Sequence, residues 1–109
     1  MGLRESSDTP GPADKTWWVY MLETDRGHLY TGVSTDVGKR FAAHTAGRGA
    51  RCLRGCARLT LRWQAPMHTR AEALSVERRI KALAPRAKQA LWRSAPDRAA
   101  VLLTLAAPR

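Results

Sequence analysis

The sequence predicts one α/β (α+β) domain, in which a small mixed sheet has helices packed on it. Two short runs of aromatic and aliphatic residues are separated by a turn, as in a β-hairpin, and a third run alternates apolar with polar residues. Segments with helical spacing of apolar residues lie between and after these runs, so the expected order is β-β-α-β-α-α. The chain of 109 residues is long enough for one domain and too short for two.

The hairpin is expected in residues 17–33. Residues 17–22 are aromatic and aliphatic, which favours a strand. Residues 24–27 carry Thr, Asp, Arg and Gly and supply turn chemistry. Residues 28–33 alternate well enough to be the second strand of the hairpin.

A helix is expected over residues 37–46, because Ser34, Thr35 and Asp36 offer helix caps directly before it. It leads into a basic loop with several glycines, which we expect to be extended and mobile. This loop separates the helix from the third strand.

The third strand is expected at residues 58–65. Leu59, Leu61 and Trp63 alternate there with polar residues, which predicts a half-exposed strand with these three on one face. We expect Trp63 to lie in the core rather than to stack on an unpaired base. Pro66 is expected to end the strand.

Two or three helices are expected after the third strand. Thr69 and Glu72 match a capping box, which predicts a helix that continues to about residue 83. Pro85 starts or interrupts a second helix, and an alanine- and leucine-rich segment predicts a last helix at 97–106. The apolar positions of the first of these helices recur at helical spacing, at Ala73, Val76, Ile80 and Leu83.

These elements divide the chain into three parts. Residues 1–14 are polar and proline-containing and are expected to be a disordered leader. Residues 15–94 are expected to form the domain itself. Residues 95–109 are expected to be a C-terminal helical extension or tail.

The strongest compositional feature is the formal charge of +10, with a pI near 11.0. Such a charge indicates a polyanionic partner, of which nucleic acid is the commonest and an anionic membrane surface the alternative. No apolar run approaches the roughly 20 residues that span a bilayer. Because part of the arginine content is typical of a GC-rich genome, the positions of the charges matter more than their number.

The chain is expected to be cytoplasmic. Its first residues lack the charged and then apolar layout of a signal peptide. Cys52 and Cys56 would close only a very short disulfide loop, and together with His44 they fall short of the four ligands of a structural zinc site. We therefore expect reduced thiols in a loop.

Tyr20 and Tyr30 are the only tyrosines of the chain, and both lie in the proposed hairpin. Antiparallel pairing allows them to share one face within reach of each other. Tyrosines also pack in strands without any further role, so this pair alone leaves both interpretations open.

Arg40 and His44 are four residues apart and therefore project from the same face of their helix. Val37 and Phe41 lie on the adjoining stripe, which must pack on the sheet. Arg40 and His44 are thus expected at the edge of the buried side. A solvated helix surface is the simpler interpretation of an arginine taken alone.

Glu77 lies between Ala73 and Ile80 on the apolar side of its helix, where a carboxylate is unfavourable unless it has a partner. Its surroundings in the sequence are basic, because no acidic residue occurs between Val37 and Ala71. Glu77 is therefore either an ion-pair partner of an arginine or a metal ligand, and its own sequence context does not separate the two.

Taken together, these residues suit phosphodiester hydrolysis, which requires an activated water and neutralisation of charge on the phosphoryl oxygens. Mg²⁺ is bound by as little as one carboxylate with waters and substrate phosphate, so Glu77 alone could suffice. Arg40 could clamp a non-bridging oxygen. A tyrosine whose pKa is lowered by nearby cations could act as general base.

The chain resembles the GIY-YIG nuclease superfamily, and within it the small stand-alone bacterial proteins of the UPF0213 group. The resemblance covers about residues 17–92, and the order and spacing of its motifs are more specific than any one of them. The matching segments are Trp18-Val19-Tyr20, Tyr30-Thr31-Gly32, Gly38-Lys39-Arg40-Phe41 followed by His44, and Ala71-Glu72-Ala73-Leu74 leading into Glu77.

The resemblance implies an α/β fold with a central three-stranded antiparallel sheet, and it implies catalytic roles. Tyr20 and Tyr30 match the two signature tyrosines, of which one activates the attacking water. Arg40 matches the arginine that stabilises the transition state. Glu77 matches the glutamate that binds the metal, Mg²⁺ or Mn²⁺. His44 matches a histidine that supports the tyrosine or the phosphate in part of the superfamily.

Three departures from the pattern are visible. Trp18 stands in place of the first signature glycine, and Thr31 in place of an aliphatic residue. Val33 occupies a position where some repair-type relatives have a lysine, so any role of that lysine is missing here.

We therefore expect a metal-dependent endonuclease that acts on DNA, in DNA repair or recombination, as a monomer or weak dimer, with a targeting protein as a further partner. A non-catalytic nucleic-acid-binding module of the same fold is the alternative. A membrane-surface protein ranks lower, because the basic residues concentrate in a loop and a strand rather than in an amphipathic helix. The residues expected to contact nucleic acid are Lys39, Arg48, Arg51, Arg54 and Arg58.

Overall fold

A computed structural model describes residues 15–106, so the expected leader at 1–14 and the last three residues lie outside the described part. None of the helices in the described part is long and apolar enough to span a membrane. The elements, in order, are β1 (Trp17–Thr24), β2 (Leu29–Ser34), α1 (Val37–Thr45), a 3-10 turn η2 (Arg51–Leu53), β3 (Leu59–Met67), α2 (Arg70–Lys81), α3 (Pro85–Arg93) and α4 (Arg98–Ala106).

The three strands form one antiparallel sheet in the order β2-β1-β3, which confirms the expected fold class. The hairpin register places Tyr20 opposite Gly32 and Leu22 opposite Tyr30. Because β1 pairs on both sides, it is the central strand and the most buried one.

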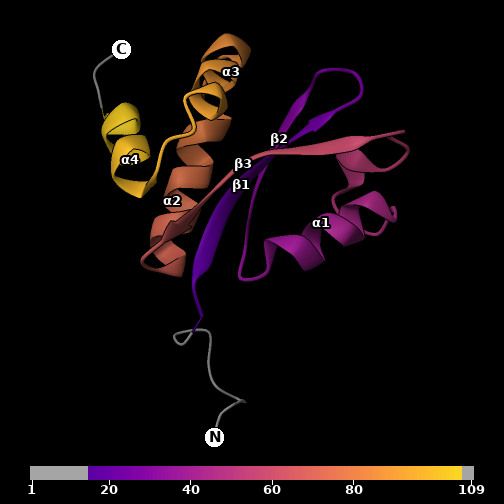
Figure 1. Cartoon of the computed structure of the whole chain (residues 1–109), viewed down its shortest axis with the longest axis horizontal. Coiled ribbons are helices and arrows are strands. Elements are labelled where there is room, and N and C mark those ends of the chain that lie inside the picture. The colour runs from indigo at the N-terminus through magenta and orange to yellow at the C-terminus, as the bar shows by residue number, and fades with distance from the viewer. Residues whose placement is uncertain (1–14, 107–109) are drawn as a thin grey trace, which may run out of the picture.

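The side chains of β1 alternate between two separate cores. Val19 and Met21 pack against α2, α3 and α4, whereas Tyr20 and Leu22 pack toward α1. Figure 1 shows this arrangement, with α1 on one side of the sheet and the other three helices on the opposite side. The larger core stabilises the domain, and the smaller one carries the tyrosines.

The prediction that Leu59, Leu61 and Trp63 share one face is wrong. The register passes from Met21–Trp63 to Leu22–Leu61, so Arg62 is an extra residue that forms a β-bulge. Leu59 and Leu61 consequently belong to the smaller core and Trp63 to the larger one. Side-chain alternation in the sequence does not reveal such a bulge, because the alternation continues through it.

Pro66 does not end the third strand, which continues to Met67. Because β3 pairs only with β1, it is an edge strand. The backbone N–H groups on its unpaired side have no neighbouring strand to bond to, so a proline there costs the sheet no hydrogen bond. Trp18 lies opposite Pro66 across the β1–β3 ladder. The strand therefore accepts the proline at the position that the sequence marked as its end.

Helix α4 is part of the same core as the sheet rather than a free extension. Val101 and Leu105 lie in the larger core. The indole Nε1 of Trp63 donates a hydrogen bond of 2.8 Å to the carbonyl of Pro96, directly before the helix. Arg98 of α4 holds Glu72 of α2 with hydrogen bonds of 2.8 and 2.6 Å, although Arg98 remains partly exposed.

Helix α3 is attached to the sheet by a polar network. The carboxylate of Glu23 accepts bonds from Arg62 at 2.7 Å and from Gln89 at 3.3 Å. Gln89 in turn accepts a bond from the indole of Trp92, and Arg62 lies over that ring. The Arg62 bond is the first cause of a lowered pKa of Glu23.

If α4 stabilises the whole domain, Val101→Ala should lower the free energy of unfolding by about 2 kcal/mol, because it leaves a cavity at a fully buried position. Urea unfolding followed by tryptophan fluorescence measures this change. Leu103→Ala on the same helix is the control, since Leu103 is 73% exposed and its truncation should leave the midpoint unchanged. Equal midpoints for wild type and Val101→Ala would mean that α4 folds independently of the sheet.

Candidate active site

Four of the predicted residues come together on the α1 side of the sheet. The rings of Tyr20 and Tyr30 have centroids 6.3 Å apart, and the ring of His44 lies 5.3 Å from Tyr30 and 6.2 Å from Tyr20. The guanidinium of Arg40 lies close enough to Tyr20 to change its pKa. The strands supply the tyrosines, and one turn of α1 supplies the arginine and the histidine.

His44 is more deeply placed than the sequence suggested, with only 2% of its surface exposed. Its Nε2 lies 3.0 Å from the hydroxyl oxygen of Tyr20, and the two form a buried hydrogen bond. Its Nδ1 accepts a hydrogen bond of 3.1 Å from the backbone N–H of Ala50. Both ring nitrogens are therefore engaged, as a buried imidazole requires.

Burial, followed by the neighbouring Tyr30, raises the pKa of Tyr20 to about 12, while Arg40 acts in the opposite direction. A tyrosine with a lowered pKa was expected, so the surroundings of Tyr20 in the protein alone act against that expectation. Burial first, and then Arg40, also lowers the pKa of His44. Because both shifts favour uncharged forms, the pair is neutral at physiological pH.

Gly32 has a structural reason that the sequence did not reveal. A Cβ atom at this position would lie 2.6 Å from the hydroxyl oxygen of Tyr20, which is closer than real Cβ contacts. The tyrosine of the first strand thus lies flat over the glycine of the second, its partner in the register. The sequence already shows this glycine in the Tyr30-Thr31-Gly32 motif. The reason for a glycine there is visible only when the register between β1 and β2 is known.

The surface beside the cluster is basic and slightly hollowed. Arg40 and Lys39 are exposed on α1, near the start of the helix, where Asp36 caps the N-terminus by accepting a bond from the Lys39 amide. A hollow of about 300 Å³ adjoins them and is lined by Lys15, Ser34, Thr35, Asp36, Lys39, Arg40 and Ala43.

Glu77 is separate from this cluster. It lies on α2, which packs against the opposite face of the sheet, and its carboxylate forms an ion pair of 3.2 Å with Lys81 one turn later. The side chain of Glu77 is 19% exposed and that of Lys81 is 52% exposed. Within residues 15–106, no hydrogen bond joins Glu77 to the tyrosines, and no three His, Cys, Asp or Glu side chains gather as a metal cluster.

The basic loop after α1 is not simply extended, which corrects the expectation. Residues 51–53 form η2, and Leu53 is buried in the smaller core with Tyr20 and Leu22. Cys52 and Cys56 are free thiols. The loop arginines all point into solvent, namely Arg48, Arg51, Arg54 and Arg58. A buried leucine thus fixes the loop while its charges remain available.

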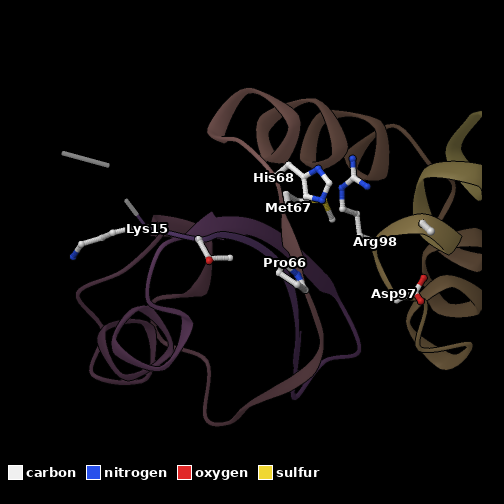
Figure 2. Close-up of a pocket in the computed structure, with 8 residues that line it drawn as sticks. Lys15, Pro66, Met67, His68, Asp97 and Arg98 are labelled. Atoms are coloured by element: carbon white, nitrogen blue, oxygen red, sulfur yellow. The ribbon is translucent and has the colours of Figure 1, made fainter. Parts of the chain in front are cut away.

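A larger hollow of about 680 Å³ lies elsewhere, between the end of β3 and the start of α4 (Figure 2). Two of its polar side chains already have structural partners. Asp97 caps α4 by accepting a bond from the amide of Ala100, and Arg98 is bound to Glu72. Lys15 and His68 also line it, but it contains none of the tyrosines. We therefore take the tyrosine cluster, rather than this hollow, as the candidate site.

A family model for the GIY-YIG catalytic domain matches residues 16–89. The match covers more than half of the chain and includes both tyrosine motifs, α1, all of α2 and the first part of α3. The chain therefore belongs to the GIY-YIG family, which is a nuclease superfamily that acts on nucleic acids.

Within that superfamily the relatives are UPF0213 proteins. One from Cronobacter sakazakii is 48% identical over 75 residues, which cover 69% of this chain and 79% of the relative. The UPF0213 protein YhbQ of Escherichia coli is 40% identical over 93 residues, covering 85% and 93%. The solution NMR structure of the UPF0213 protein BH0048 from Bacillus halodurans aligns with a TM-score of 0.50 and 30% identity, covering 85% of this chain and 99% of that one.

The contact between Tyr20 and Gly32 predicts that Gly32→Ala displaces the tyrosine and weakens its bond to His44. We expect a loss of about 1–3 kcal/mol in the free energy of unfolding, because a buried polar pair is disturbed and a backbone contact is crowded. Gly38→Ala is the control, since a Cβ there meets only an ordinary contact of 3.7 Å. Urea unfolding of the two variants measures the difference, and equal stabilities would show that the contact is unimportant.

Proposed function

We propose that the protein is a divalent-metal-dependent endonuclease that hydrolyses phosphodiester bonds in DNA. The observation that carries this proposal is the convergence of Tyr20, Tyr30 and His44 beside Arg40 on a basic surface. A domain that only bound DNA would not need a polar cluster buried between its strands and α1, because phosphate contacts are made by exposed cations.

Each residue of the cluster then has a role. Arg40 is exposed and cationic, and it binds a non-bridging oxygen of the phosphate as negative charge develops there. One tyrosine of the pair acts as the base: it first gives up its own hydroxyl proton to solvent, and the resulting phenolate takes the proton of the attacking water. Tyr30 is partly exposed and accessible to that water, whereas Tyr20 is 1% exposed and is hydrogen-bonded to His44.

Glu77 is the residue that would hold the metal. Its helix α2 covers the other face of the sheet from the tyrosine cluster but also packs against β2, the edge strand that carries Tyr30, so the metal and the cluster would share a phosphate at that edge. The surroundings of Glu77 fit a hard divalent cation. Its carboxylate is partly exposed, and its partner Lys81 is a half-exposed cation whose pairing is weak and replaceable. Mg²⁺ and Mn²⁺ need few protein ligands, because waters and substrate oxygens complete the shell. When bound, such an ion supplies Lewis acidity toward the phosphoryl oxygens.

The first test is cleavage of end-labelled single-stranded, duplex and branched DNA with Mg²⁺, Mn²⁺ or EDTA. We expect cuts that require the metal and that fall by about 100-fold or more in Glu77→Gln and in Arg40→Ala, because each removes charge stabilisation. Asp25→Asn is the matched control. It also removes one carboxylate charge, but from the exposed turn of the hairpin.

Binding measured on the same substrates separates the alternative. If the protein binds DNA but cuts none of these substrates with any metal, it is a non-catalytic binding module. Glu77 would then be only the ion-pair partner of Lys81. Cleavage that persists in Glu77→Gln would instead remove Glu77 from the site while leaving the nuclease intact.

We also propose that Lys39 and the loop arginines bind the phosphate backbone. This is supported by their exposure, by the absence of acidic residues from Val37 to Ala71, and by the attachment of the loop next to the tyrosine cluster through Leu53. Such contacts give affinity without sequence readout.

Loss of Arg51 and Arg54 should reduce the dependence of DNA binding on salt. Each phosphate contact contributes about −0.9 to the slope of log K against log salt concentration on duplex DNA, so Arg51→Ala with Arg54→Ala should flatten it by roughly 1–2. Arg78→Ala with Arg79→Ala removes the same charge from the exposed surface of α2 and is the control. If both double variants flatten the slope equally, net charge rather than this loop determines binding.

A further inference from the structure

The chain directly after α1 closes over the ring of His44. The amide of Arg48 donates a bond of 2.9 Å to the carbonyl of Ala43, which ends the helix and turns the backbone back. Gly49 is buried, and the next amide, that of Ala50, points at Nδ1 of His44. The role of Gly49 and Ala50 is not visible in the sequence, because this contact depends on the path of the loop.

The bond from Ala50 determines where the proton of His44 resides. A backbone N–H can only donate, so Nδ1 must be the unprotonated nitrogen that accepts. A neutral imidazole has one N–H, which must then be on Nε2. Since Nε2 lies 3.0 Å from the hydroxyl oxygen of Tyr20, its N–H donates to that oxygen.

We infer that Gly49 and Ala50 are positioning residues that hold His44 in the Nε2–H tautomer, so that His44 donates a hydrogen bond to Tyr20 and does not act as its base. The catalytic consequence rests on the proposed nuclease function, whereas the tautomer itself does not. In this arrangement the hydroxyl proton of Tyr20 points away from His44, so His44 does not accept it, and the N–H stabilises negative charge on that oxygen.

Space around His44 permits no other residue at position 49. A Cβ on Gly49 would lie 1.8 Å from Nδ1 and 2.6 Å from Cε1 of the ring. The backbone of Gly49 is not in the left-handed region, so the requirement is for space and not for conformational freedom. Any side chain there must push the imidazole out of its two hydrogen bonds.

Burial first, and then the charge of Arg40, oppose a second proton on His44. Tyr20 and Tyr30 face it from the strands, and Arg40 lies one turn before it on α1. An imidazolium would place an Nδ1–H against the N–H of Ala50. In mildly acidic solution His44 stays neutral in the folded protein but becomes ionised in the unfolded chain, where its pKa is about 6.5. The stabilisation of the folded state by His44 is therefore fully present above that pKa and is lost as the pH falls below it.

The test is a long-range proton–nitrogen correlation spectrum of the histidine rings in the uniformly labelled full chain, with His44→Gln used for assignment. We expect His44 to show a protonated Nε2 and an unprotonated Nδ1 that persist to mildly acidic pH. His28 and His68, which are exposed, provide the comparison. A protonated Nδ1 in His44, or a spectrum averaged between tautomers, would overturn the inference whether or not the protein cleaves DNA.

Variants test the positioning role. Gly49→Ala should abolish the fixed tautomer and lower DNA cleavage by about 100-fold, because the displaced imidazole of His44 no longer aligns Tyr20 in the site. Gly38→Ala should preserve the tautomer. His44→Gln retains an N–H donor and should therefore keep more cleavage activity than His44→Leu. If wild type has the expected tautomer but Gln and Leu lose activity equally, the donor role is wrong; if wild type never cleaves, only the proposed function fails.

Discussion

The hydrogen bond between Tyr20 and His44 is buried, and much of the local structure follows from the need to satisfy it. Two polar atoms lie in a site with almost no access to water, and either one without a partner would destabilise the fold by about 1–3 kcal/mol. The ring of Tyr20 therefore lies flat over Gly32, and the loop at Ala50 supplies a donor for the other nitrogen of His44. The glycines beside the cluster are consequences of this packing.

A second constraint is that one thin sheet must support two different faces. The larger core, on the side of α2, α3 and α4, contains mainly aliphatic side chains and buries Val19 and Met21 completely. The β-bulge at Arg62 lets the apolar residues of β3, which are two apart in sequence, serve both faces: Leu59 and Leu61 join the smaller core and Trp63 the larger one. The apolar side can thus stabilise the domain, and the α1 side can carry a buried polar cluster. Rigid strands hold the side chains of such a cluster in a fixed geometry.

The sequence predicted what depends on local spacing. The hairpin, the cap that Thr69 forms on α2 and the helices follow from short-range patterns. The even spacing of Tyr20 and Tyr30 placed both tyrosines on one face once the strands paired. What the sequence could not predict depends on the register between strands and on the path of the loop after α1. The bulge, the continuation of β3 through Pro66, the burial of His44 and the contact at Ala50 each require knowing which distant backbone lies opposite.

The pKa of Tyr20 also gives a reason for the charge of this surface. Burial raises that pKa to about 12, so the protein alone holds the tyrosine protonated at neutral pH, and ionisation is favoured only by positive charge and by hydrogen-bond donors. Arg40 supplies the first of these and the N–H of His44 the second. The absence of acidic residues between Val37 and Ala71 then serves two purposes, since the same positive potential that attracts a polyanion also lowers the free energy of the phenolate. An acidic residue in this segment would oppose both, and this is why the basic surface and the tyrosine cluster are best understood as one site.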